Sequence, residues 1–365
     1  MARHGMVSIQ VSGVTHLAAL AARWRDLEQR SDGSFFQSWT WVGSLASERF
    51  SDPLLVEATE AGRSVALGLF NRVRRRVGPS RLYLAEAGSA ELDCPYVEQN
   101  GILTETGREA ELTALCLGRL VAAHDVVLSG VGDPVVAAVR RAGGLVVTRR
   151  GQASPFIDLA AIRRNGGDYL AGRSANTRQQ LRRSDRYFER DGPIRLERAG
   201  SLASALAMLD AMAELHQQAW QARGQPGSFV RPFFRRFHAA LITSGLPRNE
   251  VALLKISAGE RTIGFLYNFV WRGRMSAYQS GFAYPDEARQ AKPGLTCHLA
   301  AIREALDRGL DIYDFLAGED RYKRSMADRS HGQFWLEAGP IWSPRLLART
   351  LLASIRHPVR APQRP

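Results

Sequence analysis

A histidine and a tryptophan share one face of an expected helix near the middle of the chain. His216 and Trp220 lie one turn apart in a stripe of apolar positions spaced by three and four residues, and Arg223 follows them. The near-neutral pKa of imidazole suits His216 to take a proton from an amine or a hydroxyl group. On this hypothesis His216 is catalytic, and Trp220 and Arg223 contact the substrate. The alternative is a histidine packed in the core.

A carboxylate stands on an expected apolar strand. Asp314 alternates with Ile312 and Leu316, so the three side chains point to one face. Burying a carboxylate on such a face is costly unless the group is paired, and carboxylates of this kind often lie in clefts with shifted pKa values. Two interpretations of Asp314 are open, a catalytic group or a structural salt bridge to an arginine.

The expected strand at 274–282 carries polar side chains on both faces. Tyr278 and Ser280 share one face, and Gln279 and Gly281 share the other. A glycine inside a strand predicts a bulge or the close approach of a ligand, and backbone donors there could bind a developing oxyanion. We expect Gln279 and Gly281 to contact the co-substrate and Tyr278 to contact the substrate, with plain sheet packing as the alternative.

The segment R-Q-A-K-P-G-L at 289–295 marks the start of another helix. A helix N-terminus leaves backbone N–H groups unpaired and carries partial positive charge, so a pyrophosphate can bind there. We therefore expect Lys292, Gly294 and Leu295 to bind the co-substrate. Pro293 has no N–H to offer, and an ordinary proline–glycine helix start is the alternative.

Arginines recur every four residues along a further expected helix. The stripe consists of Arg178, Arg182, Arg186 and Arg190, with Arg173 and Arg183 beside it and only Asp185 and Glu189 opposing it. A run of charges is usually a solvated helix face. This density of arginine also suits an anionic partner, such as a phosphate of the co-substrate, an anionic glycan, a tRNA or a membrane surface.

Composition limits the classes of protein that need to be considered. The 365 residues carry a net charge of +13, which favours anionic partners without choosing among them. A hydrophobic share of 45% is typical of a globular protein, and no apolar run approaches the ~20 residues that span a bilayer. The N-terminus lacks the pattern of a secretory signal, and three scattered cysteines argue against a disulfide framework and a metal site. A cytoplasmic protein without a metal is expected.

The pattern of the second half predicts the elements that position these residues. They are a strand at 193–199, helices at 201–223 and 231–243, strands at 250–257, 261–271 and 274–282, a helix from 294, a strand at 311–316, a helix at 320–326 and a strand at 332–338. Two short turns make the three middle strands an antiparallel meander. The helix from 294 makes the strands on either side of it parallel neighbours.

The first half repeats this order more loosely. Its strands are expected at 6–12, 53–59, 63–73, 81–87, 125–129 and 145–149, and its helices at 15–30, 37–50, 106–123 and 134–141. The same order twice predicts a structural duplication, with domains at 1–150 and 151–344.

The remaining residues, 345–365, form a basic tail that is expected to be poorly ordered. Leu346, Leu347 and Leu351 have near-helical spacing in this tail, with arginines around them. They are interpreted either as an amphipathic segment on an anionic membrane or as residues that dock onto the protein.

Four segments of the second half together resemble one protein family. They are L-H-Q-Q-A-W-Q-A-R-G at 215–224, Y-Q-S-G-F at 278–282, K-P-G-L at 292–295 and Y-D-F-L-A-G-E-D-R-Y-K at 313–323. The chain is similar to GNAT-like acyltransferases found near bacterial cellulose and exopolysaccharide biosynthesis genes, which are related to the Fem-type peptidyltransferases. The resemblance covers about residues 155–340 and, in the first half, mainly F-F-Q-S-W-T-W at 35–41. It implies an α/β (α+β) acyl-CoA N-acyltransferase (GNAT) fold with two halves in tandem.

The resemblance also implies roles for two residues of the last segment. In GNAT enzymes a tyrosine near the start of this helix often protonates the departing CoA thiolate, which makes Tyr322 the expected general acid. Lys323 is expected to neutralise a phosphate of the co-substrate or a substrate carboxylate. GNAT enzymes hold the pyrophosphate of acyl-CoA with a glycine-rich loop, and R-Q-A-K-P-G departs from that pattern by keeping one glycine.

We therefore expect an acyltransferase whose second half is catalytic. It would move an acyl group, expected to be acetyl, from acyl-CoA to an amine or hydroxyl by direct attack, because no G-x-S-x-G nucleophile motif occurs. Acyl-CoA is a co-substrate here, and no permanently bound cofactor is expected. The setting would be exopolysaccharide or cellulose synthesis, in the cytoplasm or at the inner face of the membrane, with a polysaccharide synthase as a possible partner. The alternatives are a Fem-type transferase that uses aminoacyl-tRNA and a non-catalytic scaffold.

Overall fold

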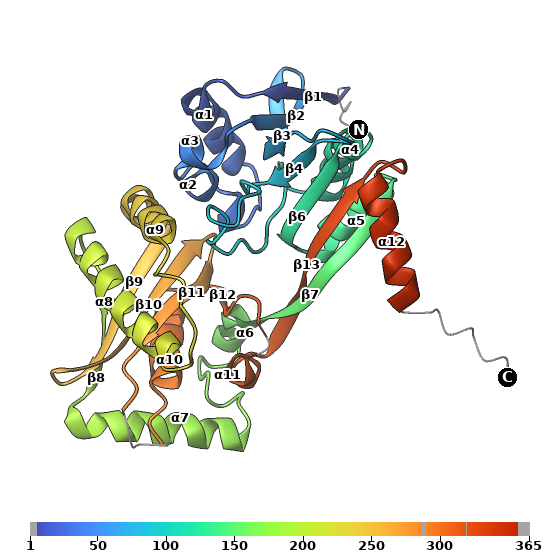
Figure 1. Ribbon diagram of the computed structural model, residues 1–365. Coiled ribbons are helices and arrows are strands. Elements are labelled where there is room, and N and C mark those ends of the chain that lie inside the picture. The colour runs from blue at the N-terminus through green and yellow to red at the C-terminus, as the bar shows by residue number, and fades with distance from the viewer. Residues whose placement is uncertain (1–5, 286–289, 319, 357–365) are drawn as a thin grey trace. The chain divides into compact units, whose positions relative to one another are not determined.

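The computed structural model describes residues 6–285, 290–318 and 320–356 (Figure 1). It divides into two compact units. The first consists of Met1–Gly151 with Gly332–Pro365, and the second of Gln152–His331. All the candidate catalytic and binding residues named above fall in the second unit.

The sheet of the second unit has the strand pairing that the sequence predicts. Its order is the end of β7 (Leu145–Asp158), then β12 (Ile312–Asp314), β11 (Arg274–Phe282), β10 (Arg261–Trp271), β9 (Val251–Ala258) and β8 (Ile194–Arg198). The strands β8 to β11 pair antiparallel. β11 and β12 pair in parallel. The predicted meander and the parallel pair joined by a helix are therefore confirmed.

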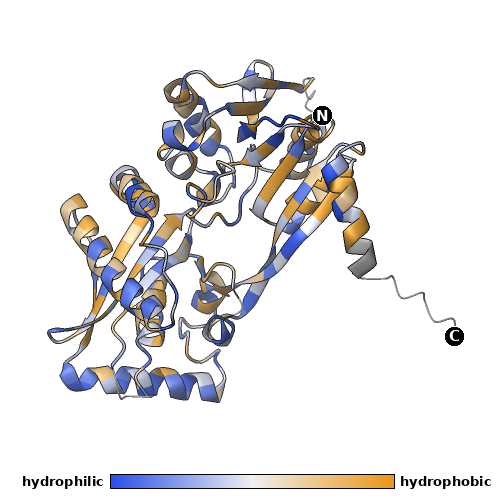
Figure 2. Ribbon diagram, viewed as in Figure 1, coloured by the Kyte–Doolittle hydropathy of each residue, from blue (hydrophilic) through white to orange (hydrophobic). Residues whose placement is uncertain are grey.

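Helices cover both faces of this sheet (Figure 1). α7 (Ala175–Phe188) and α10 (Pro293–Asp307) lie on one face, and α8 (Leu202–Gln221) and α9 (Pro232–Gly245) on the other. Alternation along a strand separates the two layers. Leu266 is buried in the cluster that contains α10, whereas the ring of Tyr267 lies 5.4 Å from His238 of α9. Figure 2 shows β9 and β10 mostly in orange and the arginine-rich α7 mostly in blue.

The first unit repeats this topology. Its sheet has the order β1 (Ser8–Gly13), β2 (Pro53–Glu60), β3 (Arg63–Val73), β4 (Arg81–Leu84), β6 (Asp125–Val131) and β13 (Arg329–Gly339), with the short β5 (Leu103–Thr104) beside β3. The first four strands pair antiparallel, and β4 and β6 pair in parallel. The connection between β4 and β6 contains α4 (Glu109–Val121). α1 (Leu17–Glu28) and α5 (Asp133–Arg141) complete the unit.

Three segments differ from the sequence-based predictions. The helix predicted at 37–50 is two single turns, α2 (Trp39–Val42) and α3 (Ala46–Arg49), because Leu45 between them adopts the left-handed region at φ 48°. The strand predicted at 332–338 belongs to β13 of the first unit, where it pairs with β6, and not to the second half. The tail begins with a helix, α12 (Pro344–Arg356), and residues 357–365 lie outside the described residues.

The boundary between the units falls inside β7. This strand starts in the first unit and ends in the second, where Phe156, Ile157 and Asp158 pair with β12. Proline inside a strand usually argues against one, but Pro155 lies within β7. The backbone carbonyl of Pro155 accepts a hydrogen bond of 3.0 Å from the N–H of Phe315. α6 (Leu159–Arg164), which the sequence did not indicate, follows the strand.

Asp314 is a structural residue, which corrects its assignment to catalysis. Its carboxylate is fully buried and accepts hydrogen bonds from Arg274 at 2.6 Å and from the N–H of Leu316 at 2.8 Å. The hydroxyl of Ser154 lies 3.4 Å from the same carboxylate. These contacts tie β7, β11 and the segment after β12 together at one end of β12. The salt-bridge interpretation of this residue is the one that the structure supports.

We predict that Asp314→Ala lowers the free energy of unfolding by about 2–4 kcal/mol, because it leaves Arg274 without its buried partner. Asp311→Ala is the matched control. Asp311 also pairs with an arginine, Arg163 at 2.6 Å, but 59% of its side chain is exposed, so its loss should cost below about 1 kcal/mol. Urea titration followed by circular dichroism measures both. Equal losses for the two variants would contradict the structural role of Asp314.

Candidate active site

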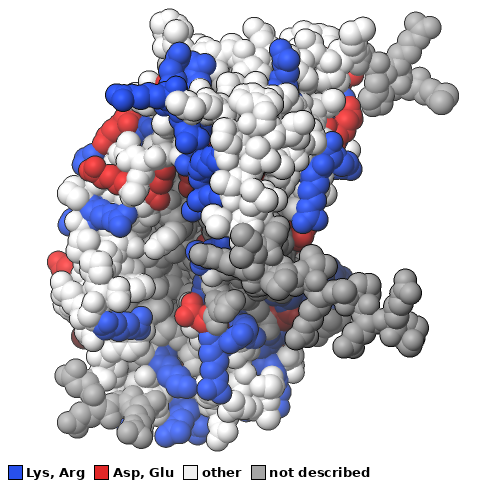
Figure 3. Space-filling model, turned by 45° about the vertical axis from the view of Figure 1, so that its right-hand side comes forward, with Lys and Arg blue, Asp and Glu red and all other residues white. Residues whose placement is uncertain are grey.

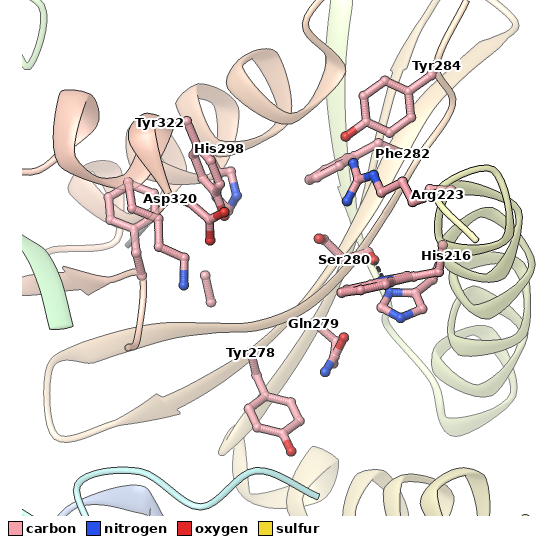
Figure 4. A pocket seen from close by; sticks show the side chains of 15 residues that line it. His216, Arg223, Tyr278, Gln279, Ser280, Phe282, Tyr284, His298, Asp320 and Tyr322 are labelled. Atoms are coloured by element: carbon pink, nitrogen blue, oxygen red, sulfur yellow. Dashed lines mark hydrogen bonds between the residues drawn. The ribbon is translucent and has the colours of Figure 1, made fainter. Parts of the chain in front are cut away.

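A pocket of about 400 Å³ opens in the second unit (Figure 4). α8 forms one wall and β11 the floor, and α10 with α11 (Arg321–Met326) forms the opposite wall. Seven of the residues predicted from the sequence line it: His216, Trp220, Arg223, Tyr278, Gln279, Tyr322 and Lys323. Five others, Asp314, Gly281, Lys292, Gly294 and Leu295, are not among its lining residues.

A β-bulge sets the orientation of the pocket floor. Tyr267 of β10 pairs with Gln279, but the next residue, Asn268, pairs with Ala277, so the register of the ladder shifts at Tyr278. An extra residue of this kind interrupts the strict alternation of a strand. The predicted placing of Tyr278 and Gln279 on opposite faces is therefore wrong, and Figure 4 shows both side chains pointing to the same side of β11. The Tyr278 ring packs 5.2 Å from the ring of His238.

His216 has the tautomer and charge of a general base. Its Nδ1 lies 3.0 Å from the backbone carbonyl of Ser280, an oxygen that can only accept, so Nδ1 carries the hydrogen. Burial lowers the pKa of the imidazole, an effect that the hydrogen bond to Ser280 opposes and nearby Arg223 reinforces. Nε2 is then an unprotonated acceptor. Nε2 is itself buried and has no hydrogen-bond partner within the described part of the chain.

Tyr322 faces His216 across the pocket and remains protonated. Burial raises the pKa of its phenol, with Asp320 and Tyr284 adding to the effect. Its ring stacks on His298 at a centroid distance of 5.5 Å and an angle of 23°. Burial lowers the pKa of His298 to about 3, so a neutral imidazole supports the phenol. A group that keeps its proton in a pocket suits the role of general acid.

Charged side chains surround the mouth of the pocket. Lys323 donates to the backbone carbonyl of Ala317 at 2.9 Å, which holds its ammonium group at the turn before α11. Arg223 lies over the Trp220 ring at 5.8 Å. Asp320 adds a carboxylate on the side of Tyr322 (Figure 4). The pocket therefore offers two cationic groups to a polar or anionic ligand, beside the base and the acid.

Gly281 contacts a helix and not a ligand. A Cβ atom at this position would overlap the carbonyl oxygen of Met212 and lie 3.1 Å from Cβ of Leu215, both on α8. The close approach that a glycine in a strand predicts is thus the approach of the α8 backbone to β11. The contribution of Gly281 to the site is indirect, because it lets α8 bring His216 within reach of Ser280.

The start of α10 is already occupied by contacts within the protein. The backbone N–H of Lys292 donates to Ser184 at 3.1 Å, and its ammonium group donates to Gln180 at 2.7 Å. Pro293 has no N–H, and the N–H of Leu295 donates back to the Lys292 carbonyl at 2.9 Å. Of the groups that were predicted to bind a pyrophosphate, the backbone N–H of Gly294 is the one for which these contacts leave no other role.

The sequence did not indicate eight residues that line the pocket: Ala219, Ala277, Ser280, Phe282, Tyr284, His298, Phe315 and Asp320. His298 lies on the buried face of α10, where a histidine resembles any packed polar residue. Asp320 stands next to the predicted Tyr322 and Lys323, and that proximity was an available signal. No group of residues that could ligate a metal ion occurs within the described ranges, and none of the helices described is long and apolar enough to cross a membrane.

Comparison with known proteins identifies the fold. Residues 175–324 match the family model described as an acetyltransferase (GNAT) domain. A search of curated proteins finds no significant match. Most of the second unit is therefore similar to a GNAT domain, and this similarity suggests acyltransferase activity.

Solved structures extend the likeness over nearly the whole chain. FemX superposes with a TM-score of 0.58 at 9% identity, covering 95% of this chain and 100% of that one. The DUF2156 domain of a putative lysylphosphatidylglycerol synthetase from Agrobacterium fabrum gives 0.55 at 11% identity, covering 93% and 97%. L-PGS from Bacillus licheniformis gives 0.54 at 12% identity, covering 92% and 97%. The predicted α+β GNAT fold with two halves in tandem is confirmed.

We predict that the His216 imidazole is neutral at pH 6.5 and protonates only in more acidic solution, because burial lowers its pKa. As the pH falls through that pKa, Nε2 gains a proton and stops being a base. NMR titration of the imidazole signals, with His216→Gln to assign the one that disappears, should give a midpoint below 6.5. A midpoint above 6.5 would contradict the neutral base.

Proposed function

We propose that the second unit transfers an acyl group from an activated donor to an amine or hydroxyl, with His216 as general base and Tyr322 as general acid. The observation that carries the proposal is the neutral His216 with an unpartnered Nε2, across a pocket from a tyrosine that holds its proton. This pairing of an acceptor and a donor of protons is what direct acyl transfer requires.

The proposed step balances without a covalent enzyme intermediate. The nitrogen or oxygen of the acceptor attacks the carbonyl carbon of the donor, and His216 Nε2 takes its proton. The bond from the carbonyl carbon to the leaving oxygen or sulfur breaks, and that atom takes the proton of Tyr322. Solvent then carries the proton from the imidazolium back to the tyrosinate, which restores both groups.

We infer further that the donor is an aminoacyl-tRNA, the co-substrate of the Fem-type enzymes that the sequence resembles. The start of α10 supports this choice, because Lys292, Pro293 and Leu295 offer a pyrophosphate few unused donors. Among the similar structures, lysylphosphatidylglycerol synthetase is named after a product that carries a lysyl group, which is an aminoacyl group. FemX has the highest TM-score of the three structures compared above.

The distribution of charge supports a polyanionic donor. Residues 152–331 contain 27 basic and 19 acidic residues, so +8 of the net +13 lies in the unit that holds the pocket. Arg321 and Arg324 line a second pocket of about 440 Å³ together with Ser174 and Asn176. Figure 3 shows lysine and arginine side chains at the lower end of the view and also at its upper end. A nucleic-acid backbone needs several such phosphate contacts.

Acyl-CoA remains the second candidate, because the family model is that of an acetyltransferase and Gly294 keeps a backbone N–H at the start of α10. The pocket and its acid–base pair support an enzyme over the scaffold alternative. The proteins compared above carry no name that refers to cellulose or exopolysaccharide synthesis. That setting and the identity of the acceptor therefore gain no support from them.

Binding measurements decide between the two donors. We predict that the full chain binds aminoacyl-tRNA in a filter assay, with an affinity that falls steeply from low to high salt as counterions are released. Arg321→Glu combined with Arg324→Glu should weaken this binding at least about tenfold. Arg248→Glu is the control, because Arg248 is exposed and lines neither pocket.

The same measurements can also contradict the inferred donor. Saturable binding of acetyl-CoA in calorimetry, weakened by Lys292→Glu, together with no binding of aminoacyl-tRNA, would contradict the inferred donor. That result would leave the acid–base assignment standing, since either leaving atom needs a proton.

We also predict that Tyr322→Phe lowers kcat by about 10²–10⁴-fold and leaves KM nearly unchanged, because only the proton donor is lost. The assay is acyl transfer to hydroxylamine as a surrogate acceptor, with the uncatalysed rate subtracted. Tyr284→Phe removes a hydroxyl from the same pocket, on a side chain that is 52% exposed, and serves as the control. Equal kcat values for Tyr322→Phe and the parent chain would exclude the acid role.

A further inference from the structure

The outer face of α12 is apolar and has no covering in the described part of the first unit. Leu346 is fully buried against the unit, and Arg345 and Arg349 both bind Glu337. The positions that turn away from these anchors at helical spacing are Pro344, Leu347, Ala348 and Leu351, and Leu352 lies at the edge of this face, in the same row as Arg345; all five are exposed and uncharged. The exposed fractions of the three leucines are 41%, 65% and 56%.

The turn before α12 extends this apolar surface. Ile341 is 70% exposed and Trp342 is 55% exposed. Both residues line a shallow hollow of about 200 Å³ beside Ala142 and Gly143. Single exposed apolar side chains are common, but five large ones within twelve residues mark a binding surface. Figure 2 shows α12 mostly in orange.

A cationic loop borders the same surface. The connection between β3 and β4 reads Arg74-Arg75-Arg76-Val77, and all four residues are exposed, Val77 at 79%. Gly78 places this loop beside the helix, because a Cβ atom there would lie 3.8 Å from Cδ of Pro344. Apolar side chains next to several arginines are the composition of helices that lie in the headgroup region of anionic bilayers.

We propose that this surface, formed by Ile341, Trp342, the outer face of α12 and the loop 74–77, docks the first unit onto an anionic membrane. The leucines and Trp342 enter the boundary between headgroups and acyl chains, where tryptophan is enriched. Arg74 and Arg75 already pair with Asp52 at 3.2 Å and Asp125 at 3.6 Å, so Arg76 is the arginine of the loop that contacts a lipid phosphate. The thirteen residues of α12 span about 20 Å, less than the ~30 Å of a bilayer core, so the helix lies on the membrane and does not cross it.

Charge favours a lipid surface over a second copy of the chain. A two-fold dimer through this face would use the same patch on both copies, and each copy would bring the Arg74–Arg76 loop to the interface. Like charges across an interface oppose association. An anionic headgroup layer neutralises the same loop. The proposal does not depend on the reaction inferred for the second unit, since every residue that it uses belongs to the first.

Co-sedimentation with vesicles tests the proposal on the full chain. We predict that the protein pellets with phosphatidylcholine vesicles that contain phosphatidylglycerol at low salt, and less with phosphatidylcholine alone. Leu347→Glu should weaken this partitioning by about tenfold or more, because it places a charge at the centre of the apolar face. Arg76→Glu should weaken binding at low salt more than at high salt.

Leu115→Glu is the matched control. Leu115 is 43% exposed, close to the 41% of Leu347, and belongs to the same unit. Leu115 lies on α4, and buried residues of α4 share a hydrophobic cluster with Leu336 of β13. Glu337, the residue after Leu336 in β13, binds α12 instead. Side chains alternate along a strand, so α4 and α12 lie on opposite faces of β13. Leu115→Glu should therefore pellet like the parent chain.

Two outcomes would overturn the proposal. The first is a parent chain that stays in the supernatant with anionic vesicles at low salt. The second is a parent chain that forms a dimer in sedimentation velocity while Leu347→Glu is a monomer, since the face would then be an interface between copies. If the thermal midpoints of Leu347→Glu and Arg76→Glu lie within a few degrees of that of the parent chain, their loss of binding is not a loss of folding.

Discussion

The contact between α8 and β11 at Gly281 is the constraint on which the pocket depends. Only a residue without a side chain lets the α8 backbone at Met212 come so close to the strand. One turn further along α8, that approach puts His216 within 3.0 Å of the Ser280 carbonyl. The hydrogen bond fixes the tautomer, and burial keeps the ring neutral. A glycine that touches no ligand thus determines the state of the candidate base.

The bulge at Tyr278 gives the pocket a rigid floor. The register shifts at Tyr278, and the Tyr278 ring lies 5.2 Å from the ring of His238 and 4.5 Å from the ring of Phe269. Burial lowers the pKa of His238 to about 3, so this aromatic cluster is neutral at ordinary pH. The charged groups of the pocket, Arg223 and Lys323 among them, stand instead at its mouth. Burial is the main cause of the pKa shifts of Tyr322 and His216, and charged groups of the pocket reinforce both shifts: Asp320 raises the pKa of Tyr322 and Arg223 lowers that of His216.

The sequence predicted elements wherever local pattern decides the structure. The bounds of β3, β10 and β11 agree with the prediction, since alternation and short turns define them locally. The break at Leu45, the passage of β7 through Pro155 and the pairing of β13 with β6 depend on distant contacts, which no local pattern contains. In the site, the sequence identified residues whose side chains have well-known acid–base or binding chemistry. His298 and the changed role of Gly281 were not identified, because both follow from how helices pack on the sheet.

The pockets of about 400 and 440 Å³ described in the second unit share α11, and under the proposed function this helix would link donor binding to chemistry. Arg321 and Arg324 lie three residues apart, so they occupy one side of the helix and line the second pocket. Tyr322 and Lys323 between them turn to the other side and line the first. A phosphate held by the two arginines would fix the rotation of α11 and with it the position of the Tyr322 hydroxyl. Because a proton donor must lie within hydrogen-bond reach of the leaving atom, binding of the donor's phosphates and protonation of its leaving group would then depend on one rigid element.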